Sequence, residues 1–589
     1  MATSNRIGKR GLVVPVRQPL GRWVRESRAG LVGLAVLIGA GAGLGAVVFR
    51  WLITTFTHLF SGQADYSAAG RVAHPWLPAL GPWFLLLAPV LAGLVYGPLV
   101  YRFAPEARGH GVPEVMYAVA ERGGRIPVQV SVVKALASAL TIGSGGSVGR
   151  EGPIVQIGSA LGSSLGRLAR LPESRLRVLV ACGAAGGIAA TFNAPLAGPF
   201  FAMELILRDF AAESFGAVVL ASVTASVVGR AVFGNSAFLA LPPFTLRNPV
   251  EYLLFVVLGL LVGACGVLFT RVLYWIEDLC DRLWRGPEWL RPAVGGVFLG
   301  GLLLALPQMY GVGYPVLQNA VEGKYVLGFL LVLMAGKIVA TSLTIGIGGS
   351  GGVFAPSLFI GAMAGTAFGI VVHAWLPSLT ASPGVYGLIG MGAAFAGAAR
   401  APITAVIVLF ELTGQYTVIL PMLTAIVIAT ATSRVLSRDT IYTLKLRRRG
   451  IDLDKHPSAR RLADTAVSAV VEPLPEPLAA GLGLASAATA LAVSGHGILP
   501  VVDERGRYQG CVTARAVAEA MADDHEGPVG DLAELPPLVT NDATLADALE
   551  ALTHAPGTGL PVLSGKDELT GWVTHQAVLT ALKPAAGVR

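Results

Sequence analysis

Apolar residues form long runs over the first three quarters of the chain, and polar residues are confined to the short stretches between these runs. Several runs reach the roughly 17–25 residues that cross a membrane as a helix. They begin near Leu31, Trp83, Phe215, Tyr252, Val294, Tyr325, Phe354, Val385 and Tyr416. Two shorter runs, 154–165 and 178–190, predict re-entrant or tilted segments. The pattern therefore predicts an all-α, polytopic membrane domain over residues 30–446.

The composition agrees with a membrane protein. The 589 residues are 53% hydrophobic and only 14% charged, with 74 glycines, which is too apolar for a soluble globular protein. The first run, 31–49, is long enough to span, and no convincing cleavage site follows it, so a secretory signal peptide is not expected. Four cysteines are scattered without the spacing of a metal site or a disulfide framework. We expect a transport protein rather than an enzyme, with no metal site.

Positive charge is concentrated in two segments. Residues 1–28 carry seven Lys or Arg against one Glu, and residues 434–461 carry nine against three Asp. Together these segments hold a charge of +12, so the remainder is slightly acidic, although the whole chain totals +8. Basic segments next to membrane spans stay in the cytoplasm, which predicts cytoplasmic N- and C-termini and an even number of crossings. A nucleic-acid-binding patch is the alternative, and the many spans argue against it.

The pattern changes after about residue 436, and from residue 464 onward the chain reads as a soluble α/β region with its own repeat. Residues 497–513 and 559–574 each predict a strand, a short turn and a second strand, followed by a helix. The expected divisions are a basic cytoplasmic N-terminus (1–29), the membrane domain (30–446), a basic linker (447–463) and two α/β copies (464–524 and 525–589).

A glycine-rich pattern occurs twice inside the apolar sequence, about 200 residues apart. The first copy, 134–162, reads KALASALTIGSGGSVGREGPIVQIGSALG, and the second, 337–365, reads KIVATSLTIGIGGSGGVFAPSLFIGAMAG. A shorter echo follows, because 193–204 resembles 400–411. Glycine and proline that interrupt apolar segments at matching positions in two halves are typical of inverted-repeat transporters, whose broken helices form a site near the bilayer midplane.

Each copy places a proline, Pro153 or Pro356, just after its glycines, where the first turn of a helix tolerates it. The glycines let the backbone approach a ligand closely, and a helix that begins there points unpaired N–H groups and the positive end of its dipole at the space in front. Two such ends that converge form a site for a dehydrated anion without a fixed cation. For the glycines before each proline we favour this site, whereas for Gly158 and Gly162 we favour tight helix packing.

Glu151 lies within the first of these turns. A carboxylate at membrane depth is costly, and it marks a functional site by default. At this position it takes the place of a bound anion and competes with it, and its protonation releases it from the positive helix ends. The residue therefore predicts a proton-sensitive gate or a proton carrier. The alternative is a structural salt bridge to a basic residue elsewhere, since Arg150 is adjacent and poorly placed for one.

Three ordered motifs make the chain resemble the CLC family of chloride channels and chloride/proton antiporters. Residues 149–153 read GREGP, a signature of that family, and residues 352–356 read GVFAP, which is similar to its GxFxP motif. Tyr442 falls where the family has a tyrosine that contacts the central ion. The resemblance implies a CLC-type fold, a homodimer with a pore in each subunit, chloride as the transported ion and Glu151 as its gate. It assigns anion binding to His110, Gly111, Gly149, Arg150, Gly152, Val353, Phe354 and Tyr442.

Two positions depart from the family pattern. The family's first anion motif reads GSGIP, but residues 109–113 here read GHGVP, so His110 either donates from a ring nitrogen or turns away and leaves binding to the backbone. Antiporters of the family commonly carry a second, inner proton glutamate just after the position of Glu204, which here is Leu205. Because leucine does not transfer a proton, we favour a voltage- or proton-gated chloride channel. The alternative is a coupled chloride/proton antiporter in which water bridges the gap.

The two C-terminal copies resemble a tandem pair of CBS domains, a cytoplasmic module that often binds adenine nucleotides. In nucleotide-binding CBS modules, an Asp three residues after a Thr usually holds the ribose. The threonines here are Thr513 and Thr574, and the positions of the Asp are Ala516 and Ala577. Adenine-nucleotide binding at these threonines and a purely structural or dimer-forming module are therefore equal alternatives.

Two hypotheses from other classes compete with anion transport. A CBS-regulated cation transporter would need acidic residues along its path, and the membrane domain offers few besides Glu151, Glu204 and Glu411. A nucleotide-sensing receptor whose membrane part is only an anchor would not require two glycine-rich broken helices. We therefore expect transmembrane chloride transport, with chloride and protons as ligands, the lipid bilayer as surroundings and no bound nucleic acid.

Overall fold

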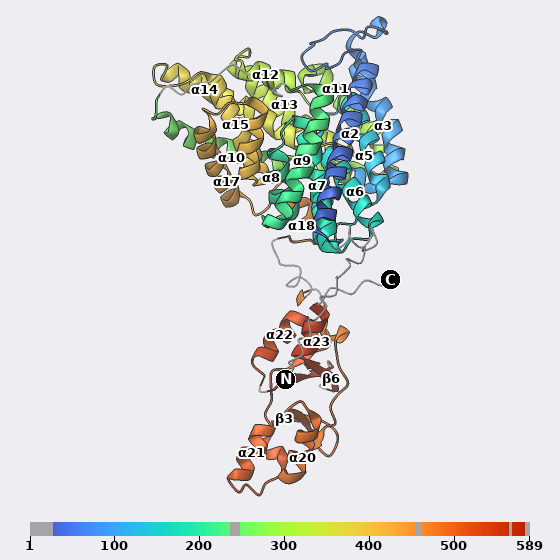
Figure 1. The fold of residues 1–589 in the computed structure, drawn as a ribbon, viewed down its shortest axis with the longest axis vertical. Coiled ribbons are helices and arrows are strands. Elements are labelled where there is room, and N and C mark those ends of the chain that lie inside the picture. Colours follow the sequence, from blue (N-terminus) through green and yellow to red (C-terminus); the bar gives the residue numbers. More distant parts are fainter. Residues whose placement is uncertain are drawn as a thin grey trace, which may run out of the picture. The chain divides into compact units, whose positions relative to one another are not determined.

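The computed structural model describes most of the chain (Figure 1). The described residues are 27–235, 239, 248–453, 462–463, 465–555, 557–564 and 568–582. Of the predicted basic N-terminus, 1–29, only the last three residues are therefore described. The middle of the predicted linker, 454–461, also lies outside the described residues.

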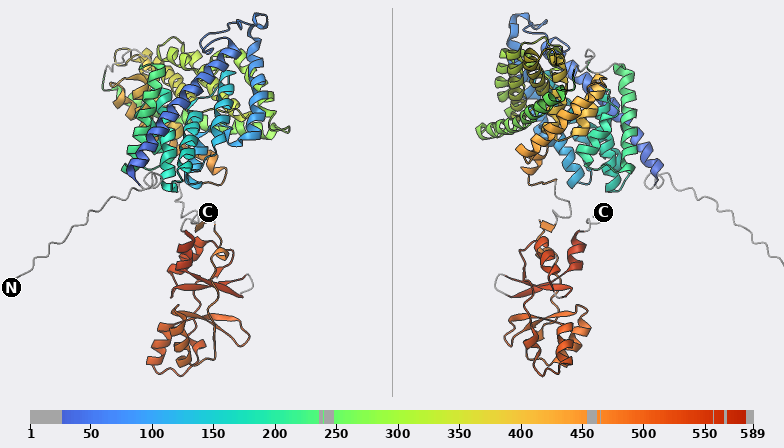
Figure 2. Two further views of the ribbon diagram at one scale, coloured as in Figure 1. Left: turned by 45° about the vertical axis from the view of Figure 1, so that its right-hand side comes forward. Right: turned by 90° about the vertical axis from the view of Figure 1, so that its left-hand side faces the viewer.

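The helices before residue 450 form two series in the same order (Figure 1). The first series consists of α2 (Arg28–Ser61), α3 (Phe84–Phe103), α4 (Val112–Glu121), α5 (Val128–Gly143), α6 (Glu151–Leu168), α7 (Glu173–Phe192), α8 (Ala197–Phe201) and α9 (Ala212–Phe233). The second consists of α10 (Glu251–Leu283), α11 (Arg291–Ala305), α12 (Tyr314–Val321), α13 (Leu327–Gly346), α14 (Phe354–Trp375), α15 (Pro383–Ala399), α16 (Pro402–Thr413) and α17 (Ile419–Leu436). Figure 2 shows these helices at a range of tilts rather than as a parallel bundle.

The two series match element by element around the doubled glycine motif. Short 3-10 helices, η2 (Pro105–Ala107) and η4 (Pro307–Met309), precede α4 and α12. The helices α6 and α14 begin at Glu151 and Phe354, with a proline in the first turn of each, as predicted. The predicted repeat is therefore present in the helices as well as in the sequence.

Eight of the described helices are long and apolar enough to cross a membrane. The run 178–190, predicted to be re-entrant or tilted, belongs to α7, whose 20 residues reach spanning length because a polar first turn extends the apolar run. In contrast, the predicted runs near Val294 and Val385 form α11 and α15, which have only 15 and 17 residues. Length and apolarity alone thus misjudge helices whose ends are polar or whose neighbours bury them.

Large apolar side chains are exposed on the outer helices. Leu37 and Trp51 on α2, Leu91 on α3, and Leu253 and Trp275 on α10 are each more than half exposed. A soluble protein rarely leaves so much apolar surface uncovered. These faces are suited to contact with lipid chains.

Glycines in α6 and α14 let these helices pack directly against their neighbours. A side chain on Gly158 would collide with the backbone of Gly183 in α7, and one on Gly361 would collide with the backbone of Gly390 in α15. A side chain on Gly162 would meet the α7 backbone in the same way. The predicted packing role of Gly158 and Gly162 is therefore confirmed.

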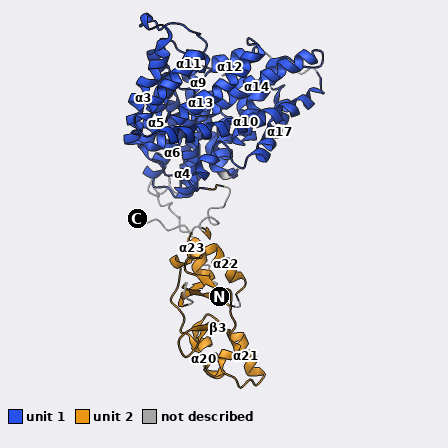
Figure 3. Cartoon of the chain, turned by 180° about the vertical axis from the view of Figure 1, so that it is seen from behind, with its two compact units in different colours: residues 1–451 blue, residues 452–589 orange. Residues whose placement is uncertain are grey.

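The chain divides into two compact units, residues 1–451 and 452–589 (Figure 3). The second unit contains two copies of the predicted α/β pattern. The first copy consists of β1 (Leu478–Ala479), α20 (Leu484–Ser494), β2 (Ile498–Val502), β3 (Tyr508–Thr513) and α21 (Ala514–Ala522). The second consists of β4 (Val539–Thr540), α22 (Leu545–Thr553), β5 (Gly559–Leu563), β6 (Leu569–Thr574) and α23 (His575–Leu582). In each sheet the first strand pairs in parallel with the second, and the second pairs antiparallel with the third.

The two sheets of the second unit share a small buried cluster. Ile498 and Cys511 of the first sheet pack with Trp572 of the second, and Leu474 and Tyr508 flank them. Figure 2 shows the two sheets facing each other with their helices on the outer sides. The pair of copies is therefore one compact body, as a tandem pair requires.

Candidate anion site

The two glycine-rich loops meet through their main chains. Gly149 donates its N–H to the carbonyl of Gly352 over 2.7 Å, and Gly352 donates its N–H to the carbonyl of Gly149 over 2.6 Å. These glycines occupy the same position in the two copies of the motif. The reciprocal bonds therefore place the starts of α6 and α14 side by side.

Hydroxyl groups extend this exchange on both sides. The Ser147 N–H donates to Thr344 Oγ1 over 3.1 Å, and the Ser350 N–H donates to Thr141 Oγ1 over 3.3 Å. Each bond joins one copy of the motif to the other. The two bonds are equivalent, because each runs from the serine N–H of one copy to the threonine hydroxyl of the other copy. The two repeats are thus related by an approximate two-fold axis that passes close to the glycine pair.

A buried lysine from each repeat holds a second loop in place. The Lys134 Nζ donates to the carbonyls of Ala107 (2.9 Å) and Gly109 (2.7 Å). The Lys337 Nζ donates to the carbonyls of Gly311 (3.1 Å) and Val312 (3.0 Å), and also to the Ser147 hydroxyl. Because both side chains are fully buried, these bonds are what makes their presence in the interior tolerable. The lysines fix the loops that precede α4 and α12.

These two loops form a further repeat that the sequence reasoning missed. Residues 109–113 read GHGVP, and residues 311–315 read GVGYP. Gly109 lies 25 residues before its lysine, and Gly311 lies 26 residues before its own. Gly111 and Gly313 both have positive φ, 83° and 86°, which favours glycine at these positions. The nearly equal distance in sequence from the first glycine of each loop to its lysine is the signal that could have revealed the second loop.

Glu151 lies in front of the start of α14. Its Oε1 accepts a hydrogen bond from the Tyr314 hydroxyl over 2.7 Å, and its Oε2 accepts one from the Ala355 N–H over 3.4 Å. The side chain is buried, with 1% of its surface exposed. No ion pair to Glu151 occurs among the described residues, so the salt-bridge alternative finds no support there. The carboxylate occupies the place predicted for an anion, and Tyr314 and Ala355 are site residues that the sequence reasoning did not single out.

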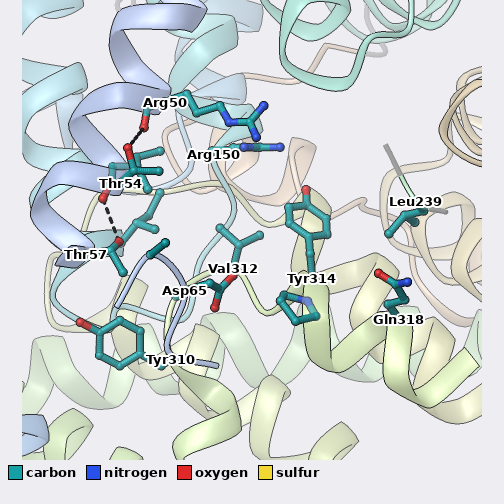
Figure 4. A pocket seen from close by; sticks show the side chains of 15 residues that line it. Arg50, Thr54, Thr57, Asp65, Arg150, Leu239, Tyr310, Val312, Tyr314 and Gln318 are labelled. Atoms are coloured by element: carbon teal, nitrogen blue, oxygen red, sulfur yellow. Dashed lines mark hydrogen bonds between the residues drawn. The ribbon is translucent and has the colours of Figure 1, made fainter. Parts of the chain in front are cut away.

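The Arg150 guanidinium packs near two aromatic rings. Its guanidinium carbon lies 5.4 Å from the centre of the Tyr314 ring and 6.0 Å from that of Phe192. It lines a cavity of about 400 Å³ together with Arg50, Asp65 and Tyr314 (Figure 4). The two guanidinium groups give this cavity a positive side next to Glu151, where an approaching anion is attracted.

Val353 and Phe354 form the buried start of α14. They are 1% and 2% exposed, and the Phe354 ring lies 4.5 Å from that of Phe395 and 5.5 Å from that of Phe192, centre to centre. The side chains thus make an apolar wall. Because the first N–H groups of a helix have no partner within it, the amides at this end of α14 can donate to a ligand.

Tyr442 immediately precedes the short helix α18 (Thr443–Arg447), and only 1% of its surface is exposed. The Tyr274 hydroxyl on α10 donates to the carbonyl of the preceding residue, Ile441, over 2.7 Å. The same Tyr274 ring lies edge-on to the His110 ring, with centres 6.0 Å apart. Tyr274 therefore contacts both His110 and the residue that precedes Tyr442, although these positions are far apart in the sequence.

His110 is buried in the loop before α4, with 1% of its surface exposed. Neither ring nitrogen has a hydrogen-bond partner among the described residues. Its carbonyl lies directly against Gly152, where a side chain would collide with it. Gly152, which was predicted to bind the anion, thus lets the first loop approach the start of α6, and Gly111 immediately precedes α4.

The glutamates of the shorter echo cap each other's helices. Glu204 accepts the N–H groups of Ile403 (3.2 Å) and Thr404 (2.8 Å) at the start of α16, and also the Thr404 hydroxyl. Glu411 accepts the N–H groups of Leu196 (2.9 Å) and Ala197 (2.7 Å) at the start of α8. Carboxylates are stabilising at such helix ends. The carboxylate of Glu204 is therefore engaged in structure.

Thr513 and Thr574, the candidate nucleotide-binding residues, act as helix caps. The Thr513 hydroxyl accepts the Ala516 N–H over 3.1 Å, and the Thr574 hydroxyl accepts the Ala577 N–H over the same distance. The Thr574 hydroxyl also donates to Glu472 Oε2 over 3.1 Å. The equivalent caps show that the two copies fold alike, and they give each threonine a structural task.

Two family models match the chain. The model described as voltage gated chloride channel matches residues 92–434, and the model described as CBS domain matches residues 529–584. Together they cover most of the first unit and the second α/β copy.

Several known proteins are similar to the chain. A putative chloride channel protein, ClcB-like, of Ralstonia nicotianae is 32% identical over 433 residues, which are 73% of this chain and 99% of the relative. The H(+)/Cl(−) exchange transporter ClcA of Vibrio cholerae is 37% identical over 428 residues, 70% of this chain and 88% of the relative.

Among solved structures, a slow cyanobacterial Cl−/H+ antiporter has a TM-score of 0.62 at 26% identity, covering 73% of this chain and 100% of that one. A eukaryotic CLC transporter has a TM-score of 0.60 at 22% identity, covering 93% of this chain and 97% of that one, and it shows the same fold.

Proposed function

Because the chain belongs to the voltage-gated chloride channel family, CLC, we propose that it exchanges chloride for protons across a membrane. Membership shows a multi-pass membrane protein for anion transport. The sequence favoured a channel because Leu205 replaces the inner proton glutamate. The relatives support the antiporter alternative better, since a relative at 37% identity is named an exchange transporter and a solved structure at 26% identity is titled an antiporter. The cation-transporter hypothesis is set aside on the same grounds.

The observation that carries the proposal is the position of the Glu151 carboxylate in front of α14. A carboxylate and a chloride ion both seek the N–H donors at the start of a helix, so they compete for one place. The carboxylate is held there by a hydroxyl and an amide, and both of these donors also suit an anion. A single residue can therefore alternate with chloride at the site.

Protonation of Glu151 converts this competition into exchange. The neutral side chain loses its attraction to the positive end of α14 and leaves, so that chloride takes its place. When the proton is released to the other side, the carboxylate returns and displaces the chloride. Each cycle thus moves a proton and chloride in opposite directions, because the charged Glu151 carboxylate and chloride compete for the same place at the start of α14.

We infer specific roles for the other residues of the site. Chloride is held by the amides of Val353 and Phe354 and by the Tyr442 hydroxyl. The turn of Gly149, Arg150 and Gly152 presents Glu151 to it. His110 and Gly111 close the site on the side of α4, where the imidazole faces the anion.

Transport in sealed liposomes tests the proposal. Purified protein is reconstituted at neutral pH with a tenfold chloride gradient, and internal pH and chloride are recorded together. An exchanger driven by chloride moves protons uphill until the two gradients balance. Chloride movement without uphill proton movement would contradict exchange and support the channel. No movement of either ion would contradict anion transport by this chain.

The same family membership supports two proposals about assembly. We propose a homodimer, and the apolar, exposed Leu420, Leu423 and Val427 along one side of α17 fit such an interface. We also propose that both termini are cytoplasmic, as the basic segments at the two ends of the membrane domain predict. Chemical cross-linking in membranes tests the first, and protease accessibility of the two ends in oriented vesicles tests the second.

For the C-terminal pair we propose a structural module rather than a nucleotide sensor. The hydroxyls of Thr513 and Thr574 are engaged as helix caps, and alanine stands where an acidic residue would hold a ribose. Isothermal titration of the full-length protein with ATP and AMP is expected to give no binding heat. Saturable heat with either nucleotide would contradict this proposal.

A further inference from the structure

Exchange needs a titratable group that passes protons to Glu151, and Leu205 does not supply one. The present inference rests on the proposed exchange. Glu204 is occupied by three donors from α16. Glu114 is paired with Arg449 at 2.9 Å and with Lys445 at 3.6 Å. The carboxylates of Glu204 and Glu114 are therefore held in structural contacts.

His110 differs from these groups because its imidazole is buried and its nitrogens have no hydrogen-bond partner among the described residues. Burying a polar group without a partner is costly, and such a group marks a place where a ligand or a proton is received. The loop is fixed on one side by Lys134, which donates to the Gly109 carbonyl. On the other side the His110 carbonyl lies against Gly152, the residue next to Glu151. The His110 main chain is thus held against the residue next to the gate.

Charged groups lie close to the loop that carries the imidazole. Lys134 of α5 donates to the Gly109 carbonyl, the Lys445 Nζ of α18 lies against Gly109, and Arg449 pairs with Glu114 at the start of α4. Glu114 of α4 balances part of this charge through its ion pairs, and the Tyr274 ring of α10 packs edge-on against the imidazole. The positive charges of Lys134 and Lys445 next to Gly109 disfavour a further positive charge on the neighbouring ring. A bound anion beside the ring supplies the missing negative charge.

We propose that His110 relays protons to Glu151, and that it takes up its proton only while an anion occupies the site beside it. The proton is accepted by one ring nitrogen and released from the other, so the ring returns to its neutral form and no other bond is made or broken. Because linkage is reciprocal, an anion that favours the imidazolium is itself bound more tightly by it. This makes proton entry conditional on chloride, which is what exchange without an inner glutamate requires.

Calorimetry isolates this proton from that of the gate. In a Glu151→Gln background the gate no longer titrates, so proton uptake on chloride binding comes from other groups. Saturating chloride is added in buffers of different ionisation enthalpy at pH 6.5, and the slope of heat against that enthalpy counts the protons taken up. We expect measurable proton uptake on chloride binding in this background, and a loss of at least fivefold when His110→Ser is added. The matched control, His373→Gln, changes a histidine whose Nδ1 already contacts Thr380, and it is expected to leave the slope unchanged.

Transport then tests whether this proton is on the pathway. In liposomes, His110→Ser is expected to lower the number of protons moved per chloride at least tenfold, and adding Leu205→Glu is expected to restore it within threefold of the wild type. Equal proton uptake with and without His110→Ser, or no uptake in either, would overturn the proposal. Undiminished proton pumping by His110→Ser would also overturn it. If the wild-type protein moves no protons, exchange itself fails, whereas the calorimetric slope still reports whether His110 binds a proton with chloride.

Discussion

The two repeats of the membrane unit share the residues that build the site and differ in the residues that do its chemistry. Lysines at 134 and 337, threonines at 141 and 344, and glycines at 149 and 352 make equivalent contacts in both halves. Where the first half has Glu151, the second has Phe354. The scaffold is therefore symmetric, and the titratable groups are added to it on one side.

The loops before α4 and α12 show the same division. Both begin with a glycine held by a buried lysine, and both lead into a helix through glycine and proline. The variable positions carry His110 and Val112 in the first loop, but Val312 and Tyr314 in the second. Tyr314 donates to Glu151 across the axis. Each half thus contributes a different polar side chain to a single site.

Glu151→Gln tests the asymmetry most severely, because it makes the titratable gate permanently neutral. We expect proton transport to fall to background. Wild-type chloride flux should rise as pH falls, since protonation frees the carboxylate from α14, whereas the variant should show the flux of the protonated form at every pH. Flux assays in liposomes between pH 5 and 8 measure both effects. The control Glu322→Gln, at an acidic residue of α12's end that pairs with Lys324, should behave as wild type.

Replacing the buried lysines tests whether the shared scaffold is equally important in both halves. Lys134→Met removes one donor from each of two carbonyls, of which Ala107 keeps the Ser350 hydroxyl and Gly109 keeps the Gly351 N–H. We therefore expect the free energy of unfolding to fall by about 1–3 kcal/mol, at roughly 0.5–1.5 kcal/mol for each lost hydrogen bond. Lys337→Met should cost as much or more, because its third partner, Ser147, belongs to the other repeat. Chemical denaturation in detergent micelles measures both losses.

The exposed Lys324→Met provides the baseline for this comparison, since that side chain is 58% exposed. A loss below about 1 kcal/mol for either buried lysine would show that its loop is held by other contacts. A large loss for one lysine alone would break the symmetry that we infer.

Tyr314→Phe removes the polar group that the second half supplies to the gate. A hydrogen bond to a charged group contributes about 1.5–3 kcal/mol, so the carboxylate should leave α14 more readily. We expect chloride turnover at pH 7.5 to rise by up to roughly tenfold, with proton coupling retained. Stopped-flow flux measurements give the rate, and Tyr310→Phe, which removes a hydroxyl from the same cavity, is the control. A rate that does not change would mean that the Ala355 amide alone holds the carboxylate.

Glu204→Gln and Glu411→Gln probe the reciprocal caps, where the smallest effects are expected. A charge at a helix N-terminus contributes about 0.3–1 kcal/mol, so each variant should lose a similar, small amount of stability. Neither should change the number of protons moved per chloride by more than about twofold. A loss of coupling in Glu204→Gln alone would return Glu204 to the proton pathway and argue against the structural role found here.

Much of this site could be predicted from the sequence because glycine and proline mark the positions where its backbone needs a special conformation. The repeat, the starts of α6 and α14 and the placing of Glu151 all follow from those residues. Tyr314 and Ala355 could not be found in this way, because a tyrosine and an alanine at helix starts carry no distinctive pattern. Their importance comes from the axis between the repeats, which brings together residues more than 160 positions apart in the sequence.

The echo that ends in Glu204 and Glu411 shows the converse. The sequence correctly indicated a repeated unit, but a glutamate in an apolar segment looks the same whether it moves protons or caps a helix. Only the position of Thr404 and Ala197 decides between the two. Whether a buried carboxylate caps a helix or carries protons thus depends on hydrogen-bond donors from distant segments. A local sequence pattern does not contain these donors.

The reciprocal bonds between Gly149 and Gly352 also bear on how the protein is made. The ribosome adds about 5–20 residues per second, so the first glycine waits roughly 10–40 s for a partner that is synthesised some 200 residues later. Throughout that time the first half carries loops whose polar main chain has no partner of its own, in surroundings that do not supply one. A nascent chain halted between the repeats would therefore need shielding by the insertion machinery or by a second fragment. Two separately expressed halves should therefore associate in the membrane, because each half carries main-chain groups whose hydrogen-bond partners lie in the other half.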